Sequence, residues 1–335
     1  MFKKSPFFIA EISANHNGSL KNAKKLINQA KRYGANAVKL QTYLPDLITI
    51  KSKKKYFKIK DGLWKNYYLW DLYNKGKTPF EWHSELFRYA KKVGITLFST
   101  PFDEKSLKLL EDLNCPFYKV ASFEMTHLPL IKKIAATKKH MIISTGMANL
   151  KEIKLTYETA IKHGAKGVTL LYCVSNYPSK IVDFNLRNIE ILKKKFNCQV
   201  GLSDHCKDNI ISTLSLSLGA NVFEKHIALR GTNSLDAEFS LKGKEILEYR
   251  KNLDQSFNLI KSHKFKKIKD ELKNKKFRCS IFSQQDIKKG EKFSKNNIRI
   301  ARPSHGLEPK YYEKIIGKKC KINLKKNLPV LKKYI

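Results

Sequence analysis

The feature that most constrains the fold is a repeat of short apolar segments, most of them followed by a helical pattern. The eight segments lie at residues 7–13, 37–42, 96–101, 117–122, 141–146, 168–173, 200–204 and 222–226. Eight β–α repeats in about 260 residues predict an α/β fold, the TIM (β/α)8 barrel. A doubly wound open sheet is the alternative. It is weaker because no GxGxxG turn opens the chain and the strands number eight.

Two regions depart from this repeat. Residues 44–78 form a long excursion after the second predicted strand, rich in Lys, Tyr and Trp, which predicts a substrate-facing loop with some helix of its own. After the predicted barrel, residues 1–262, the lysine-dense stretch 263–276 lacks apolar periodicity and predicts a linker. Residues 277–335 hold short strand-like pieces and many turns. They predict a small, mostly β domain that is marginal alone and is expected to pack on another surface.

The formal net charge of +38 has three interpretations. They are nucleic-acid binding, attraction of anionic small substrates, and a lysine-rich bias on solvated surfaces. The lysines are scattered over every segment, and no RNA- or DNA-binding motif accompanies them. The third interpretation therefore weighs most and substrate attraction comes second, so we expect no nucleic-acid partner.

The cysteines and apolar segments indicate a compartment. None of the six cysteines forms a CxxC pair, so we expect reduced thiols in a cytoplasmic protein. The apolar run at 7–10 is too short for a signal peptide. No segment has the length and apolarity of a membrane span, so we expect no membrane association.

Two histidines end the last two predicted strands. His205 closes VGLSDH and His226 closes VFEKH, with a helical stretch between them. Consecutive strands of a βαβ unit end side by side, so the two imidazoles are candidate ligands of one divalent metal. A single strand-end histidine is more often a hydrogen-bonded structural residue. The polar residues at the other predicted strand ends favour a metal site here.

Polar residues end most of the other predicted strands as well. By period two, Lys39 and Gln41 share one face of the second strand. The remaining polar strand ends include Glu11, Lys119, Ser122, Ser144, Ser175, Tyr177, Ser203 and Glu224. Singly, Glu224 could simply pair with a lysine and Ser122 could cap a helix. Together, lysines and hydroxyls at one barrel mouth are costly to bury unless they bind an anion. The pattern predicts a metal-assisted lyase, aldolase or synthase acting on a phosphorylated or acidic substrate.

Seven strings in this chain resemble the sialic acid synthase family: AEISANHNGS, VKLQTY, FSTPFD, YKVASFE, STGMA, VGLSDH and EKH. Residues 280–319 look like the antifreeze-like (SAF) domain that follows the barrel in that family. The resemblance covers nearly the whole chain. It implies a transferase that condenses phosphoenolpyruvate with an N-acetylated amino sugar to give a nonulosonic acid.

Further strings resemble the branch of the family that makes pseudaminic acid, as in flagellin glycosylation. They are GLW, LYNKGKTPFEWH, CVSNYP, SLDAEFSL and RPSHGLEPKYY. Ser175 stands where the neuraminate and legionaminate branches typically carry Asn, which favours the pseudaminate branch. The implied sugar is 2,4-diacetamido-2,4,6-trideoxy-L-altropyranose. N-acetylneuraminate or legionaminate synthesis is the alternative within the family.

The resemblance also implies roles for individual residues. His205 and His226 match the metal ligands, usually described with Mn2+, with Mg2+ or Co2+ as alternatives. Glu11 matches the acid near the attacking water. The residues that hold the phosphate and carboxylate of phosphoenolpyruvate are matched by Lys39, Lys119, Ser122, Ser144 and Ser203. The sugar-pocket residues are matched by Gln41, Ser175, Tyr177 and Asp236. Arg302 matches an arginine that reaches the sugar site of a partner subunit, which implies a domain-swapped homodimer.

Two functions outside this family compete with it. A Schiff-base aldolase would use Lys39 or Lys119 as its nucleophile. A non-catalytic nucleic-acid binder would rely on the positive charge alone and would need no metal.

Overall fold

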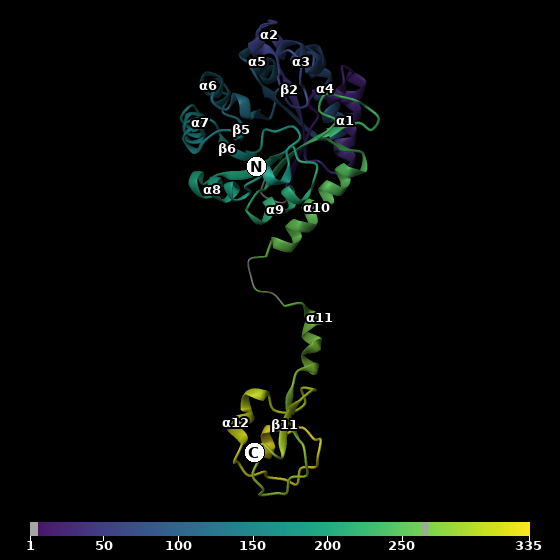
Figure 1. The fold of residues 1–335 in the computed structure, drawn as a ribbon, viewed down its shortest axis with the longest axis vertical. Helices are drawn as coiled ribbons and strands as arrows, with labels where there is room; N and C mark the ends of the chain where they lie inside the picture. Colours follow the sequence, from purple (N-terminus) through teal and green to yellow (C-terminus); the bar gives the residue numbers. More distant parts are fainter. Residues whose placement is uncertain (1–5, 263–264, 266) are drawn as a thin grey trace. The chain divides into compact units, whose positions relative to one another are not determined.

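The structure, a computed structural model, describes residues 6–262, 265 and 267–335. The chain forms two compact units, Met1–Lys261 and Ser262–Ile335, which are treated separately here (Figure 1). Of the expected linker 263–276, residues 263, 264 and 266 lie outside the described residues.

The first unit is a closed barrel of eight parallel strands. The strands are β1 (Phe7–Glu11), β2 (Ala37–Thr42), β3 (Thr96–Pro101), β4 (Phe117–Val120), β5 (His140–Ser144), β6 (Gly167–Cys173), β7 (Gln199–Asp204) and β8 (Val222–Ala228). Each strand pairs with the next in sequence, and β1 also pairs with β8. This last pairing confirms the TIM barrel and excludes the open doubly wound sheet. A short β9 (Leu241–Lys242) pairs in parallel with the end of β8.

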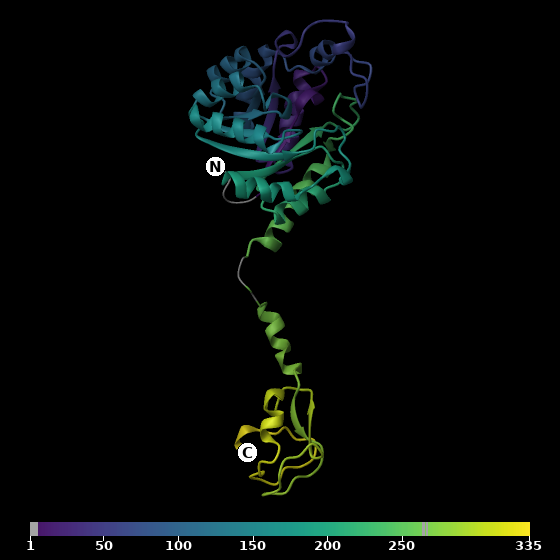
Figure 2. The same ribbon diagram turned by 60° about the vertical axis from the view of Figure 1, so that its left-hand side comes forward.

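Helices cover the outside of the barrel. They are α1 (Leu20–Arg32), α4 (Phe80–Val93), α5 (Glu104–Asp112), α6 (Leu128–Ala136), α7 (Leu150–Lys162), α8 (Arg187–Phe196), α9 (Ile210–Ser217) and α10 (Lys244–Ile260), and they surround the strands in Figure 2. The sequence sets their ends. Asn149 caps α7 in a capping box with Glu152, and Gly94 ends α4 at a φ of 74°. Among all the residues that the structure describes, no helix is long and apolar enough to cross a membrane.

The strands of the barrel pack closely at β7 and β8. A Cβ placed on Gly201 would lie 2.0 Å from the carbonyl oxygen of Val222. Only glycine fits at this position, and its absence of a side chain lets β7 approach the start of β8.

The excursion after β2 carries some helix, as expected. It contains α2 (Pro45–Ile48), a 3-10 turn at Lys55–Phe57 and α3 (Leu69–Gly76). An isolated antiparallel bridge joins Lys58 to Tyr68 and closes its middle part. Trp64 anchors it at a second point, because its indole N–H donates to the carbonyl of Leu235 beyond β8, at 3.1 Å.

The second unit is small. Its strands β10 (Ser280–Ser283) and β11 (Ile298–Ala301) pair antiparallel, and α12 (Tyr312–Ile315) follows them. The buried core consists of Ile281, Ile287, Phe293, Ile298, Ile315, Cys320, Leu324 and Val330. The part of the expected linker that is described is not irregular throughout. It contains α11 (Lys269–Leu272) and a 3-10 helix at Lys273–Phe277, whose residues are exposed.

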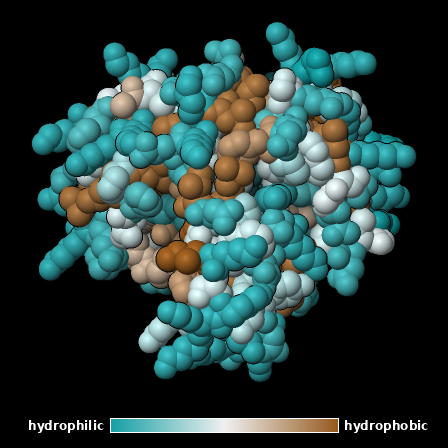
Figure 3. All heavy atoms as spheres, turned by 90° about the horizontal axis from the view of Figure 1, so that it is seen from above, coloured by the Kyte–Doolittle hydropathy of each residue, from teal (hydrophilic) through white to brown (hydrophobic). Residues whose placement is uncertain are grey.

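Hydrophilic residues cover most of the face seen in Figure 3, where hydrophobic residues form a band near the middle. Among the described residues, the lysines other than Lys39, Lys119 and Lys225 are exposed or half-buried.

Candidate active site

The carboxyl ends of the barrel strands gather a set of buried polar side chains. Parallel strands all end on one side of the barrel, so residues from distant parts of the sequence meet there. Predicted site residues that are buried at this end are Glu11, Lys39, Lys119, Ser122, Ser144, Ser203, His205, His226 and Asp236. Gln41, Ser175 and Tyr177 are half-buried.

Two lysines and two carboxylates form one ion cluster at this end. Lys39 Nζ lies 2.8 Å from Glu11 Oε2 and 2.9 Å from Glu224 Oε1. Lys119 Nζ lies 3.7 Å from the same Glu224 oxygen, to which Ser203 Oγ donates at 3.2 Å. The pairing of Glu224 with barrel lysines is therefore part of the site itself.

Burial and mutual attraction set the charges of this cluster. Burial lowers the pKa of Lys39 to about 8, although Glu224 opposes the shift. Burial acts to raise the pKa of Glu224, but Lys119 and Lys39 together lower it to about 2. At neutral pH the cluster therefore holds an ionised Lys39 against an ionised Glu224.

The two candidate metal ligands face each other. The ring centroids of His205 and His226 lie 5.4 Å apart. His205 Nδ1 lies 3.1 Å from the carbonyl oxygen of Val174, so this nitrogen donates a proton to the carbonyl. Burial opposes the charged ring, but Cys173 and Val174 raise the pKa of His205, and a cation would bind Nε2 of the neutral ring. His226 Nδ1 is buried and has no hydrogen-bond partner among the described residues, and Asp236 Oδ2 lies 3.7 Å away.

The donor set fits a divalent cation. Burial lowers the pKa of His226 well below its usual value, so its imidazole is neutral, the form that binds metals. Within the described residues, no three His, Cys, Asp or Glu side chains are grouped as a complete metal site. A cation here would be held by the two imidazoles and would complete its shell with water or substrate, as catalytic metals do.

Hydroxyl groups without partners lie at the same end. Ser144 Oγ and Thr100 Oγ1 are buried and lack hydrogen-bond partners in the described part of the chain. The turn after β5 presses close to two further serines. A Cβ on Gly146 would lie 2.4 Å from Ser122 Cβ and 2.7 Å from Ser175 Oγ. Glycine at this turn therefore leaves these hydroxyls accessible to a ligand.

A cavity of about 490 Å3 opens beside His226. Its aromatic walls are formed by Tyr43, Trp64, Tyr73, Phe102, Phe123, Tyr177 and Phe239. Tyr177 packs on His205 with ring centroids 4.3 Å apart, and Phe239 lies 4.9 Å from His226. The predicted residues Gln41 and Asp236 supply polar groups to the same cavity.

The site includes residues that the sequence reasoning missed. Thr100 lies in the string FSTPFD and Glu124 in YKVASFE, so a polar residue beside a strand end was available as a signal for both. Trp64 had no such signal, because its place depends on how the excursion folds over the barrel. Arg302 follows β11 in the second unit, where it is exposed, so the geometry of the barrel does not bear on it.

The chain matches the NeuB family over residues 26–265 and the SAF domain over residues 278–334. It belongs to the NeuB family. It is 42% identical to a pseudaminic acid synthase of Campylobacter jejuni, over 96% of this chain and 94% of that protein. It is 40% identical to the pseudaminic acid synthase of Helicobacter pylori, over 97% of this chain and 96% of that protein.

Other relatives act on related sugars. An N,N'-diacetyllegionaminic acid synthase of Campylobacter jejuni is 38% identical, over 97% of this chain and 98% of that protein. The crystal structure of an N-acetylneuraminic acid synthetase from Leptospira borgpetersenii has a TM-score of 0.72 at 28% identity, over 81% of this chain and 90% of that one. These matches confirm the resemblance on which the sequence assignment depended, including the SAF domain.

We predict that Glu124 makes the stability of the barrel depend on pH. Burial raises the pKa of its carboxyl to about 7, although Lys119 opposes this. The pKa of Glu124 is thus higher in the folded chain than in the unfolded chain, where it is about 4.5. Its contribution to stability is fully present below pH 4.5 and is lost as the pH rises through 7. Between pH 4.5 and 7.5, the free energy of unfolding of the unmodified protein should fall by up to about 3 kcal/mol relative to that of Glu124→Gln. Chemical denaturation measures this difference.

The matched control is Glu158→Gln, on the exposed side of α7. A pH-independent difference between the protein and Glu124→Gln would show that the Glu124 carboxyl is ionised throughout this range.

Proposed function

We propose that this chain condenses phosphoenolpyruvate with 2,4-diacetamido-2,4,6-trideoxy-L-altropyranose, releasing phosphate and forming pseudaminic acid. The observation that carries the proposal is the placement of two lysines and two imidazoles at one barrel mouth, beside an aromatic cavity. Similarity to two pseudaminic acid synthases over nearly the full length of the chain supports the choice of reaction.

The lysine cluster suits phosphoenolpyruvate. Its phosphate and carboxylate need buried cations and hydroxyl donors. Lys39 and Lys119 supply the charge, and Ser122, Ser144 and Ser203 supply the hydroxyls. Ser144 lacks a partner within the described residues and is free to donate to an incoming oxygen. These groups would hold the enol so that its C3 faces the sugar.

His205 and His226 would hold the metal. Mn2+ is the ion we propose, with Mg2+ and Co2+ as alternatives. When bound, it would polarise the aldehyde oxygen of the open-chain sugar and so make C1 electrophilic. The hydrogen bond of His205 to Val174 fixes the plane of its imidazole. Asp236 lies 3.7 Å from His226 Nδ1, close enough to attract a cation held there.

Glu11 would handle the proton of the attacking water. Carbon 3 of phosphoenolpyruvate forms a bond to C1 of the sugar, water adds at C2, and phosphate leaves by C–O cleavage. The backbone N–H of Ser13 donates to Glu11 Oε1 at 2.6 Å, and Lys39 pairs with Oε2. The carboxylate is thus held in one orientation and would accept the proton that the water releases.

The aromatic cavity suits a deoxygenated, twice acetylated sugar. The proposed substrate carries two acetamido methyl groups and a methyl in place of a hydroxymethyl group, and aromatic walls favour such groups. Gln41, Glu124 and Asp236 offer polar partners for the remaining hydroxyl and amide groups. Legionaminate synthesis is the second candidate, since one such synthase is 38% identical. Ser175 favours the pseudaminate branch.

The aldolase alternative is less well supported, because both candidate nucleophiles are held by carboxylates. Borohydride with substrate would trap a lysine only in that case. We place the enzyme in the cytoplasm, where phosphoenolpyruvate is made. No nucleic-acid or membrane partner is part of the proposal.

The first test is a product assay. Phosphoenolpyruvate is offered with the L-altro diacetamido sugar, its legionaminate counterpart and N-acetylmannosamine, and the products are read by mass spectrometry. A chelator should abolish condensation and Mn2+ should restore it. In His226→Ala, Mn2+ should restore less than about 1% of the activity. The control is His163→Ala at the end of α7. Full activity of metal-depleted His226→Ala would refute the metal assignment.

We predict that Trp64 sets sugar affinity. Its ring packs on Tyr177 at 5.3 Å between centroids and forms a wall of the cavity. Trp64→Ala should raise KM for the L-altro diacetamido sugar about tenfold while KM for phosphoenolpyruvate stays nearly constant. Trp70→Ala, in the same excursion but bonded to Asp46, is the matched control. Higher kcat/KM for N-acetylmannosamine in the unmodified protein would instead favour the neuraminate branch.

We also propose a domain-swapped homodimer in which Arg302 serves the sugar site of the partner subunit. A small unit of this size is marginal alone, and in a two-fold swapped dimer each site would be built from both chains. The test is complementation. His205→Ala and Arg302→Ala chains, each inactive, are mixed under subunit exchange. A swapped dimer yields one site without either lesion, so activity should return. If no activity returns after exchange is verified, the swap is wrong.

A further inference from the structure

Each candidate metal ligand follows a charged residue whose side chain points away from the barrel interior. Asp204 precedes His205 at the end of β7, and Lys225 precedes His226 in β8. Side chains alternate along a strand, so the histidines face the interior while the charged residues face the surrounding helices. Asp204 lies directly opposite Lys225 in the parallel register of β7 and β8.

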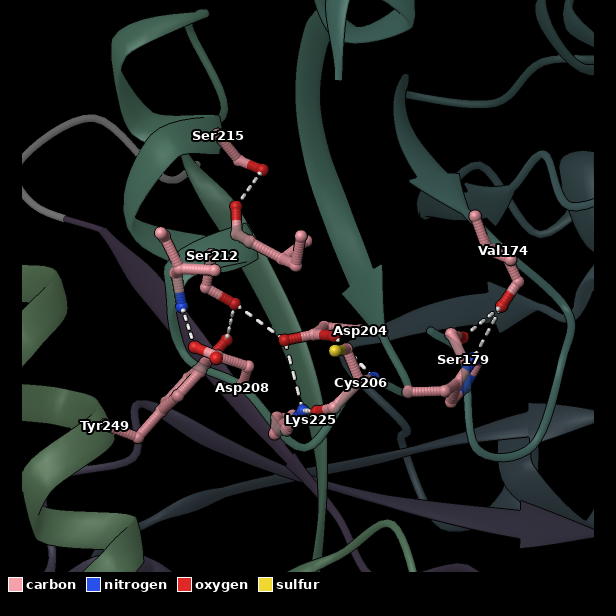
Figure 4. A network of polar contacts seen from close by, with 12 residues as sticks. Val174, Ser179, Asp204, Cys206, Asp208, Ser212, Ser215, Lys225 and Tyr249 are labelled. Atoms are coloured by element: carbon pink, nitrogen blue, oxygen red, sulfur yellow. Dashed lines mark hydrogen bonds and ion pairs between the residues drawn. The ribbon is translucent and has the colours of Figure 1, made fainter. Parts of the chain in front are cut away.

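These two residues form an ion pair that is closed off from solvent. Lys225 Nζ lies 3.1 Å from Asp204 Oδ2, and neither side chain is exposed. Ser212 Oγ of α9 donates to the same oxygen at 2.8 Å. Ser212 also pairs with the hydroxyl of Tyr249 from α10 at 2.8 Å. Figure 4 shows this network between the strands and the two helices.

The same pair holds the turn that carries His205. The backbone N–H of Cys206 donates to Asp204 Oδ1 at 2.8 Å, and Lys225 Nζ donates to the carbonyl oxygen of Cys206. The residues on both sides of His205 are therefore tied to Lys225, directly or through Asp204. Lys225 is itself the chain neighbour of His226.

A second set of contacts fixes His205 from the opposite flank. The backbone N–H of Ser179 donates to the carbonyl oxygen of His205 at 3.1 Å, and Val174 accepts from its ring; both lie across the turn from Lys225 in Figure 4. The contacts with Val174 and Ser179, which follow β6, orient His205. The ion pair adds a link of another kind: beside the pairing of β7 with β8, it ties the turn that carries His205 to the chain neighbour of His226.

A buried ion pair is a poor source of net stability, because the desolvation of both charges offsets their attraction. Its directional contacts can instead specify one arrangement among several. We propose that Asp204 and Lys225 are positioning residues for the metal site. They hold β7, β8 and the 204–206 turn so that His205 and His226 converge on one cation. This inference rests on the metal role proposed above for the two histidines.

The test removes both charges at once. Asp204→Asn combined with Lys225→Met leaves no unpaired buried charge, so the barrel should fold. Cobalt(II) is titrated into the purified, metal-free protein without substrate, and its visible absorption reports binding. The apparent Kd for Co2+ should rise by about 10- to 100-fold, as for other residues that orient metal ligands. KM for phosphoenolpyruvate, measured at saturating metal, should stay within about twofold.

The matched control removes another polar pair of the same barrel. Arg250 of α10 pairs with Asp254 and donates to the carbonyl of Pro6, near the start of β1. Arg250→Met with Asp254→Asn should loosen α10 without changing the Kd for Co2+. Thermal unfolding of both double variants is recorded beside the titrations.

The outcomes separate the two proposals. Weaker cobalt binding in the Asp204/Lys225 variant alone supports positioning. Unchanged binding in that variant, or equal weakening in both, overturns it while leaving the metal site intact. The metal assignment fails if the unmodified protein does not bind Co2+, or if His205→Ala and His226→Ala bind it equally well. The inference then fails as well.

Discussion

The pairing of the first strand with the last is the constraint on which the rest of the site depends. In the register of β1 with β8, Glu11 lies opposite His226, and in the register of β1 with β2 it lies opposite Lys39. One carboxylate is therefore placed between a candidate metal ligand and a candidate anion ligand. An open sheet with the same strand order would leave His226 at the opposite edge from Glu11 and Lys39, so closure of the barrel creates the site.

The electrostatics of the site follow from burial. An isolated buried ammonium or carboxylate is unstable, so each must find a partner. In the part of the chain that the structure describes, the buried lysines are Lys39, Lys119 and Lys225. Each lies within 4 Å of a carboxylate. The other lysines that the structure describes are exposed or half-buried, so most of the positive charge they contribute lies on solvated surfaces. Any attraction of anionic substrates by this charge acts from outside the barrel.

The sequence was sufficient to predict the barrel and the face on which its polar residues lie. Period two placed Lys39 and Gln41 on one face, and the strand ends identified His205 and His226. A pairing of Glu224 with a barrel lysine was among the expectations. That Lys39 and Lys119 both approach the same Glu224 oxygen was not, because it depends on barrel closure and strand stagger, which no local pattern records. Trp64 was not among the predicted site residues for a similar reason. It lines the cavity only when the excursion folds over the barrel and its indole N–H donates to Leu235.

The alternation along β7 and β8 joins two kinds of buried polar contact. Ser203 and Glu224 meet inside the barrel, and Asp204 and Lys225 meet outside it. A slip of the register by one residue would turn each set to the wrong side. It would place a lysine among the ligands and an imidazole among the apolar helix contacts. The inner and outer pairs therefore select the same register, and contacts on the outer face of the strands support the position of the candidate site residues on the inner face.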